Sequence, residues 1–386
     1  PLFQSLYERL HISAEEFIRT TDQKKHWHTE QALWTKLMEK NVLEKRTYTG
    51  LYCTGCERFL TKKDLVDGLC AIHQKAPEEV KEENWFFKLS EESGWLKKIL
   101  TDGTYSTIPN FRAPETLTLI DQGLEDVSFS RPKTSLNWGI PVPNDPDHVM
   151  YVWCDALTNY ISGLGAFTDH SEMKDWWDSA KVTHVIGKDI ARFHALIWPA
   201  MLKHAGVRIP DQLLIHGFLS SEGQKMSISL GNVVQPEEVL EHFGGNPDPL
   251  RFYLSHEIPV GNDADFSWKR IDELYDAHLR NTIGNLLNRV LVMFQKIGTD
   301  LSLTKSWDIS SDWKAYDDAF AEANLHGLQH VTSLAKTGNQ KFNEAEPWKL
   351  KGDEQRASLS EFAELLRHFA LLLLPFTPQT AQEISR

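Results

Sequence analysis

Residues 184–189 read His-Val-Ile-Gly-Lys-Asp, a short apolar run that ends at a glycine and leads into a helical pattern. A second apolar run, Val149 to Trp153, leads into a helix that we predict to end at Ile161. A third run, Leu213 to Leu219, closes on the polar turn Ser220 to Gln224. Strands that alternate with helices are typical of an α/β fold. These segments predict part of a doubly wound sheet.

The flanking segments have other patterns. Residues 13–44 are predicted to be helical, because Ser13 and Glu16 have the spacing of a capping box and apolar residues follow at helix-like intervals. A β-type run at Tyr48 to Tyr52 indicates a small separate lobe, and a helical stretch is predicted to start at Trp85-Phe86-Phe87. The last part of the chain has long helical patterns without strands, which predicts an all-α bundle: Ile271 to about Gly298, Trp313 to Phe342 and Leu359 to Leu374.

Composition limits the function classes. The 386 residues are 41% hydrophobic, which suffices for two or three packed domains, and no apolar run approaches the ~20 residues that a membrane span needs. The net charge of −13 gives no chain-wide signature of a nucleic-acid binder, although local clusters of Lys and Arg can still bind phosphate. The four cysteines are too few and too clustered for a disulfide framework, so we expect a reducing compartment.

Three of the cysteines and one histidine have the spacing of a metal site. The motif is C-x2-C-x13-C-x2-H, formed by Cys53, Cys56, Cys70 and His73. Zinc favours four sulfur or imidazole ligands at tetrahedral corners, and a full protein ligand set leaves no open position for substrate. The sequence therefore predicts one structural Zn²⁺.

The polar turn after the third strand continues as Lys225-Met226-Ser227-Ile228-Ser229. Taken alone, it is compatible with an ordinary β-turn. It also resembles the KMSKS loop of class I aminoacyl-tRNA synthetases, whose lysines reach the triphosphate of ATP. Lys225 matches the first lysine, but Ile228 stands where the family has the second. Because isoleucine cannot neutralise phosphate charge, we expect slower amino-acid activation, or none, unless another cation substitutes.

Several other segments resemble the methionyl-tRNA synthetases within that class. Residues 151–160, 184–190 and 193–200 look like the family's methionine-pocket segments, and residues 19–22, 130–132 and 138–141 match the same subgroup. The resemblance covers essentially the whole chain. It implies a partial Rossmann-type class I catalytic domain with an inserted zinc lobe, followed by an all-α anticodon-binding bundle.

The resemblance also implies site residues, position by position. Those expected to bind methionine are Trp153, Ala156, Leu157, Tyr160, Ile190, His194 and Trp198, although Leu157 and Ile190 are equally compatible with plain core positions. Those expected at ATP are Gly187, Asp189, Lys225, Ser227 and the position of Ile228, and the catalytic residues are Lys225 and Arg131, for which a surface salt bridge is the alternative. Those expected at the anticodon are Asn285, Arg289, Pro347 and Trp348, where Pro-Trp is also compatible with a hydrophobic staple.

The expected function is the ATP-dependent attachment of L-methionine to its tRNA through methionyl-adenylate, in cytoplasmic protein synthesis, with Mg²⁺ accompanying the ATP. The expected domains are the end of the first catalytic half (1–46), a connective insert with the zinc knuckle (47–130), the second catalytic half (131–232), a stem-contact linker (233–270) and the anticodon-binding helices (271–386). The family's His-x-Gly-His signature does not occur. We therefore expect a fragment that is weakly active or inactive by itself.

Three alternatives remain open. The missing histidine signature and Ile228 favour a catalytically impaired, tRNA-binding paralogue. Another class I synthetase, for leucine, isoleucine, valine or cysteine, would share the loop, but the aromatic pocket and the lack of a long editing insert argue against it. A zinc-stapled α/β hydrolase or transferase of another kind is the third.

Overall fold

The computed structural model describes residues 2–55, 58–60, 64–72, 74–226, 231–297, 307, 310–321 and 326–385. The chain forms two compact units, one of residues 16–213 and one of residues 1–15 with 214–386. Among the described residues, no helix is both long and apolar enough to cross a membrane. The mixture of strands and helices confirms the predicted α/β class.

The first unit begins with a π-helical turn, η1 (Gln23–Trp27), that runs into α2 (His28–Glu39). The prediction that the helix begins at Ser13 was wrong. The helical segment begins at η1, and Asp22 is its capping residue. The Asp22 carboxylate accepts hydrogen bonds from the backbone N–H groups of Lys24 and Lys25 at 3.0 and 3.1 Å. Glu16, the expected partner of Ser13, forms an ion pair with Lys25 instead.

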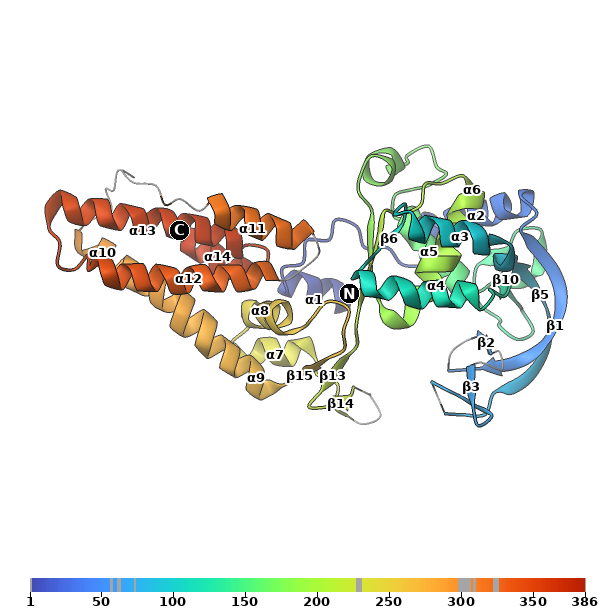
Figure 1. The fold of residues 1–386 in the computed structure, drawn as a ribbon. Helices are drawn as coiled ribbons and strands as arrows, with labels where there is room; N and C mark the ends of the chain where they lie inside the picture. The colour runs from blue at the N-terminus through green and yellow to red at the C-terminus, as the bar shows by residue number, and fades with distance from the viewer. Residues whose placement is uncertain are drawn as a thin grey trace. The chain divides into compact units, whose positions relative to one another are not determined.

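A long antiparallel pair, β1 (Leu43–Cys53) and β5 (Glu78–Phe87), dominates the next segment, and Figure 1 shows the two strands as a curved ribbon. The predicted β-run at Tyr48 to Tyr52 is confirmed within β1. The predicted helix start at Trp85-Phe86-Phe87 was wrong, because these residues end β5 and pair with β1. The sheet order is β2-β1-β5-β7, with β2 (Arg58–Leu60) and β7 (Val127–Ser128), and β3 (Leu65–Val66) pairs separately with β4 (Leu69–Cys70).

The rest of this unit alternates strands and helices, as predicted. The predicted strand at 149–153 ends earlier, because α5 already begins at Val152. Two three-stranded sheets have the orders β8-β10-β9 and β11-β12-β6. The elements are η3 (Leu89–Glu92), α3 (Ser93–Thr101), β6 (Ser106–Ile108), η4 (Asn110–Arg112), α4 (Ala113–Asp121), β8 (Ser130–Pro132), β9 (Pro141–Val142), β10 (Asp145–Met150), α5 (Val152–Ser162), η5 (Lys174–Asp178), β11 (Thr183–Gly187), η6 (Lys188–Ile190), η7 (Phe193–Ile197), α6 (Trp198–Ala205) and β12 (Gln212–His216).

The second unit starts with α1 (Leu2–Arg9) and resumes with a small sheet of order β14-β13-β15, in which β13 and β15 are parallel. The predicted strand at 213–219 is divided between β12 and β13. Its remaining elements up to the long helices are β13 (Leu219–Ser221), β14 (Gln224–Lys225), α7 (Pro236–His242), α8 (Asp248–Glu257) and β15 (Ala264–Phe266).

The described residues after Ser267 lie mainly in helices. They are α9 (Trp268–Leu274), η9 (Tyr275–Gly284), α10 (Asn285–Ile297), α11 (Ser310–Ala321), α12 (His326–Ala345), α13 (Gly352–Leu373) and α14 (Pro378–Ser385). Two packed helices, α11 and α12, replace the single helix predicted from Trp313 to Phe342. Helices α10, α12 and α13 contact one another, and a Cβ at Gly338 would lie 2.9 Å from Leu286 and 2.8 Å from Leu365. Glycine at this position lets the three helices approach closely.

Candidate functional site

Helix α5 carries four of the residues predicted to bind methionine. Trp153, Ala156, Leu157 and Tyr160 recur at helical spacing, so they share one face. Leu157 is buried, whereas Trp153, Ala156 and Tyr160 are half-buried. The helix begins directly after Tyr151, whose extended backbone turns the chain out of strand β10.

A histidine from the π-helical turn η7 meets this face. The Tyr160 hydroxyl lies 2.8 Å from His194 Nε2, and His194 Nδ1 lies 3.0 Å from the Ile190 carbonyl oxygen. A carbonyl oxygen only accepts, so Nδ1 carries the hydrogen, and the tyrosine hydroxyl donates to Nε2. Burial lowers the pKa of His194 and raises that of Tyr160 to about 12, so both groups are neutral near pH 7.

A second histidine, His184 at the start of β11, completes the surroundings of Tyr160. Its ring centroid lies 3.9 Å from that of Tyr160, and the indole N–H of Trp198 donates to its Nε2 at 3.1 Å. Burial and the neighbouring His194 lower its pKa to about 3, which keeps it uncharged. His184 lies in a segment that resembles the family's methionine pocket, but it was not among the residues predicted for the site. Its position opposite Tyr160 depends on sheet packing, which spacing does not reveal.

Trp153 forms the other end of this group of rings. It stacks on Phe193 with the ring centroids 3.8 Å apart and the planes 10° from parallel. It also meets the edge of His194 at 6.5 Å. We call Trp153, Tyr160, His194 and Trp198 the aromatic wall. The structure thus brings the seven residues predicted for methionine into one neighbourhood, supplied by α5, η6, η7 and α6.

The wall is an uncharged, polarisable cluster in which Trp153 and Tyr160 are half-buried and His194 and Trp198 are buried. The Tyr160 hydroxyl, both ring nitrogens of His194 and the Trp198 indole N–H already have hydrogen-bond partners, and the partner of Trp198 is His184. Aromatic rings make favourable contacts with thioether sulfur. A charged side chain would lose its hydration there without gaining an ionic partner from these four residues. The arrangement therefore suits an uncharged side chain of methionine type.

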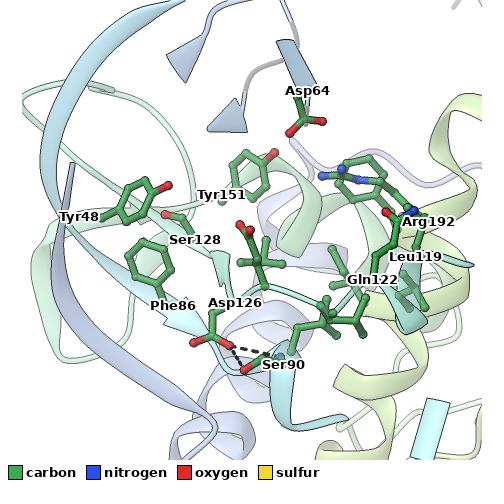
Figure 2. A pocket seen from close by; sticks show the side chains of 18 of the residues that line it. Tyr48, Asp64, Phe86, Ser90, Leu119, Gln122, Asp126, Ser128, Tyr151 and Arg192 are labelled. Atoms are coloured by element: carbon green, nitrogen blue, oxygen red, sulfur yellow. Dashed lines mark hydrogen bonds between the residues drawn. The ribbon is translucent and has the colours of Figure 1, made fainter. Parts of the chain in front are cut away.

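A cavity of about 680 Å³ adjoins the wall through Phe193, which both lines it and stacks on Trp153. Figure 2 shows Tyr151, Arg192 and Asp126 around it, with the Asp126 carboxylate accepting from the Ser90 hydroxyl at 2.6 Å. Asp126 also pairs with Arg46 at 3.1 Å. This cavity was not predicted from the sequence, because its lining comes from segments far apart in the chain.

Arg131 lies on β8 and lines the same cavity. Its Nη1 donates to the Ser128 hydroxyl and the Ser130 carbonyl, both at 2.8 Å, and its guanidinium lies over the ring of Tyr151 at 4.7 Å. The side chain is buried, at 6% exposure, and does not lie at the surface. A buried guanidinium held in place beside a cavity is suited to bind an anionic group.

The residues expected at ATP are divided between the two units. Gly187 ends β11 and Asp189 lies exposed in η6, so the predicted strand-to-helix turn is present. Lys225 is the last residue of β14 and pairs with Ser220 across a tight hairpin. Ser227 and Ile228 lie outside the residues that the structure describes.

The structure describes two of the four predicted zinc ligands. Cys53 ends β1 and Cys70 ends β4, and both are buried in one small cluster with Leu60. Cys56 and His73 lie outside the described residues. Within the described ranges, no group of three or more metal-ligating side chains occurs.

The residues expected at the anticodon lie together in the second unit. Arg289 on α10 has its guanidinium 4.7 Å from the ring of Phe342 and 5.9 Å from that of Trp348. Asn285, one turn before it, donates to the Asn339 side chain at 3.1 Å. Trp348 is 46% exposed, whereas Pro347 beside it is buried. An exposed ring next to an arginine is a suitable platform for an unpaired base.

Comparison with known proteins agrees with this geometry. The family model described as tRNA synthetases class I (M) matches residues 2–70 and 60–291. A methionine–tRNA ligase of Fusobacterium nucleatum is 35% identical over 100% of this chain and 62% of its own length. One from Caldanaerobacter subterraneus is 37% identical over 99% of this chain and 61% of its own length. This chain thus spans about three fifths of these relatives.

Solved structures give the same result. Mycobacterium tuberculosis methionyl-tRNA synthetase bound by methionyl-adenylate superimposes with a TM-score of 0.90 and 32% identity, covering 99% of this chain and 79% of that one. Its apo form gives a TM-score of 0.85 at 31% identity over the same shares. Because the family model covers residues 2–291 and these relatives match essentially the whole chain, the chain belongs to the methionyl group of the class I tRNA synthetases.

Proposed function

We propose that the protein containing this chain attaches L-methionine to its tRNA in two steps. The methionine carboxylate attacks the α-phosphorus of ATP, forming methionyl-adenylate and releasing pyrophosphate. A terminal hydroxyl of the tRNA then attacks the acyl carbon, which releases AMP. The observation that supports this most strongly is the uncharged aromatic wall, in which Tyr160 and His194 satisfy each other and leave aromatic faces for a thioether.

The chain's own residues would act by positioning and charge. Lys225 and Arg131 are proposed to stabilise phosphate charge, with Gly187 and Asp189 at the nucleotide and Mg²⁺ arriving with the ATP substrate. Arg131 is already held by Ser128 and Ser130, so it needs little reorganisation when charge develops. Because residue 228 is isoleucine, the loop has no second lysine that could stabilise phosphate charge. We also propose that the chain has the five domains expected from its sequence, and that the protein is located in the cytoplasm.

Activation is tested by the exchange of labelled pyrophosphate into ATP in the protein that contains this chain. We expect exchange to depend on L-methionine and not on leucine. Restoring the second lysine with Ile228→Lys should raise its rate, whereas Lys225→Ala should lower it. A leucine-dependent exchange would instead assign the chain to another amino acid, and tRNA binding without exchange would favour the impaired paralogue.

We also propose one structural zinc ion held by Cys53, Cys56, Cys70 and His73. The support from the described residues is that Cys53 and Cys70 are buried in the same cluster at the ends of two strands. Such a site would fix the small lobe beside β1 and supply no catalytic chemistry.

Elemental analysis after dialysis against a chelator is expected to give about one zinc per chain. Cys53→Ser should lose the metal. Cys154→Ser, which changes a buried cysteine of α5 outside the motif, should retain it. A Cys53→Ser chain with full zinc content would contradict the ligand assignment.

The anticodon is proposed to bind at Asn285, Arg289, Pro347 and Trp348. Trp348→Ala is expected to weaken binding of tRNA with a methionine anticodon about tenfold, because base stacking on an aromatic ring contributes ~1–3 kcal/mol. Filter binding at fixed salt measures this, with Leu371→Ala as a control at an exposed apolar position on α13. Equal weakening for all tRNAs, or loss of stability alone, would favour the staple alternative.

A further inference from the structure

Helix α5 also buries polar side chains on the face opposite the aromatic wall. At 100° per residue, Asp155 and Ser162 lie seven residues apart on the same side of the helix, roughly opposite Trp153 and Tyr160. Both are polar and nearly buried, at 9% and 2% exposure. Buried polar groups in a helix of this kind require specific partners.

One residue supplies partners to both of them. His26 Nε2 lies 2.6 Å from the Asp155 carboxylate, and His26 Nδ1 lies 2.7 Å from the Ser162 hydroxyl. The histidine is fully buried. Its two contacts are two helical turns apart along α5, so a single ring opposes both rotation and sliding of the helix.

The residue types resemble a Ser-His-Asp catalytic triad, but the location excludes that role. A nucleophile must be reachable by its substrate, whereas Ser162 is 2% exposed and His26 is not exposed at all. The Ser162 hydroxyl also lies 3.3 Å from the Asn159 carbonyl oxygen within its own helix. The three side chains therefore hold structure in place and do not attack a substrate.

The backbone around His26 supports a specialised role. His26 lies in the π-helical turn η1, and His194, which binds Tyr160 on the other side of α5, lies in the π-helical turn η7. Single π turns in α-helical segments occur frequently at functional sites. A capping residue, Asp22, fixes the start of η1 through two backbone hydrogen bonds.

We propose that His26, bound to Asp155 and Ser162, is a positioning residue that sets the placement of α5 and so determines affinity and selectivity at the aromatic wall. The inference rests on the proposed methionine site. It acts through the opposite face of the helix: a shift of α5 would move the Tyr160 hydroxyl away from His194 Nε2 and would change the packing of Trp153 on Phe193. Small misplacements of this kind have large effects on binding and catalysis.

The test compares calorimetric affinities of this chain for L-methionine and L-leucine. His26→Gln and Ser162→Ala each remove one or both contacts to α5. Each should weaken methionine binding and reduce the preference for methionine over leucine. For His26→Gln we expect the affinity for methionine to fall about tenfold. Thr29→Val is the matched control: it deletes a buried hydrogen bond at the start of α2, from Thr29 to the Ala166 carbonyl, that does not involve α5. It should lower stability without changing methionine affinity.

A double-variant cycle tells positioning from a general loss of stability. In a Tyr160→Phe background, the bond to His194 is already absent, so Ser162→Ala should have a smaller effect than in the unmodified chain. Equal effects in both backgrounds, or unchanged affinity in folded His26→Gln and Ser162→Ala chains, would overturn the inference. Failure of the unmodified chain to bind methionine would count against the proposed function, which is a separate outcome.

Discussion

Trp153→Ala is expected to weaken methionine binding about thirtyfold. The indole is half-buried and stacks on Phe193 at 3.8 Å, so it offers a large apolar face to a ligand while contributing modestly to the core. Removing that face costs roughly 2 kcal/mol of buried apolar contact, and each ~1.4 kcal/mol is a factor of ten in affinity. Calorimetric titration with L-methionine measures the change.

The control for this prediction is Trp176→Ala in η5, a tryptophan of the same unit that is 55% exposed and not part of the wall. It should leave methionine affinity unchanged. If the folded Trp153→Ala chain bound methionine as tightly as the unmodified chain, Trp153 would be a packing residue and the wall would need another composition.

Glu30→Gln is expected to stabilise the chain at pH 8. Glu30 on α2 is fully buried, and burial raises its pKa from the ordinary 4.5 to about 7, although the thiol of Cys154 donates to it at 3.0 Å. The folded chain therefore holds this proton more tightly than the unfolded chain. Between pH 4.5 and 7 the unfolded state has lost the proton and the folded state keeps it, so the free energy of unfolding falls by about 3 kcal/mol as the pH rises.

The glutamine variant has no proton to lose, so this fall should be absent and the variant should exceed the unmodified chain in stability by up to about 3 kcal/mol above pH 7. Urea denaturation at pH 5 and pH 8 measures the difference. Glu39→Gln, at an exposed position on the same helix, serves as the control. Parallel stability profiles for Glu30→Gln and the unmodified chain would show that Glu30 is ionised in the folded state.

Local sequence patterns correctly predicted those helices and strands in which the spacing of apolar residues matches the face that is buried. The strand before Gly187 and the helix α13 are of this kind. The pattern misled at residues 85–87, where three aromatic side chains look like a helix start but pair with β1, because long-range ladder bonds decide their conformation. It also misled at Ser13, since a helix is capped where a side-chain oxygen reaches its first backbone N–H groups, and here that oxygen belongs to Asp22.

The site was predictable wherever its residues fall within short motifs. Tyr160 and His194 were selected from such motifs, and the structure places them 2.8 Å apart. His184, His26 and the cavity lining were not selected, because their partners lie in other segments and only the fold brings them together. No sequence pattern predicts that Glu30 and Cys154 share a buried hydrogen bond across 124 positions.

The most direct test of the account is a calorimetric titration of this chain with L-methionine, with leucine and homocysteine as competitors. The geometry predicts saturable binding in which the affinity for methionine exceeds that for leucine and homocysteine. The reason is that the aromatic wall offers rings and already hydrogen-bonded polar groups to an uncharged thioether. Binding of leucine as tight as that of methionine, or no binding of either by a chain whose circular dichroism shows that it is folded, would contradict the assignment of the wall as the methionine site.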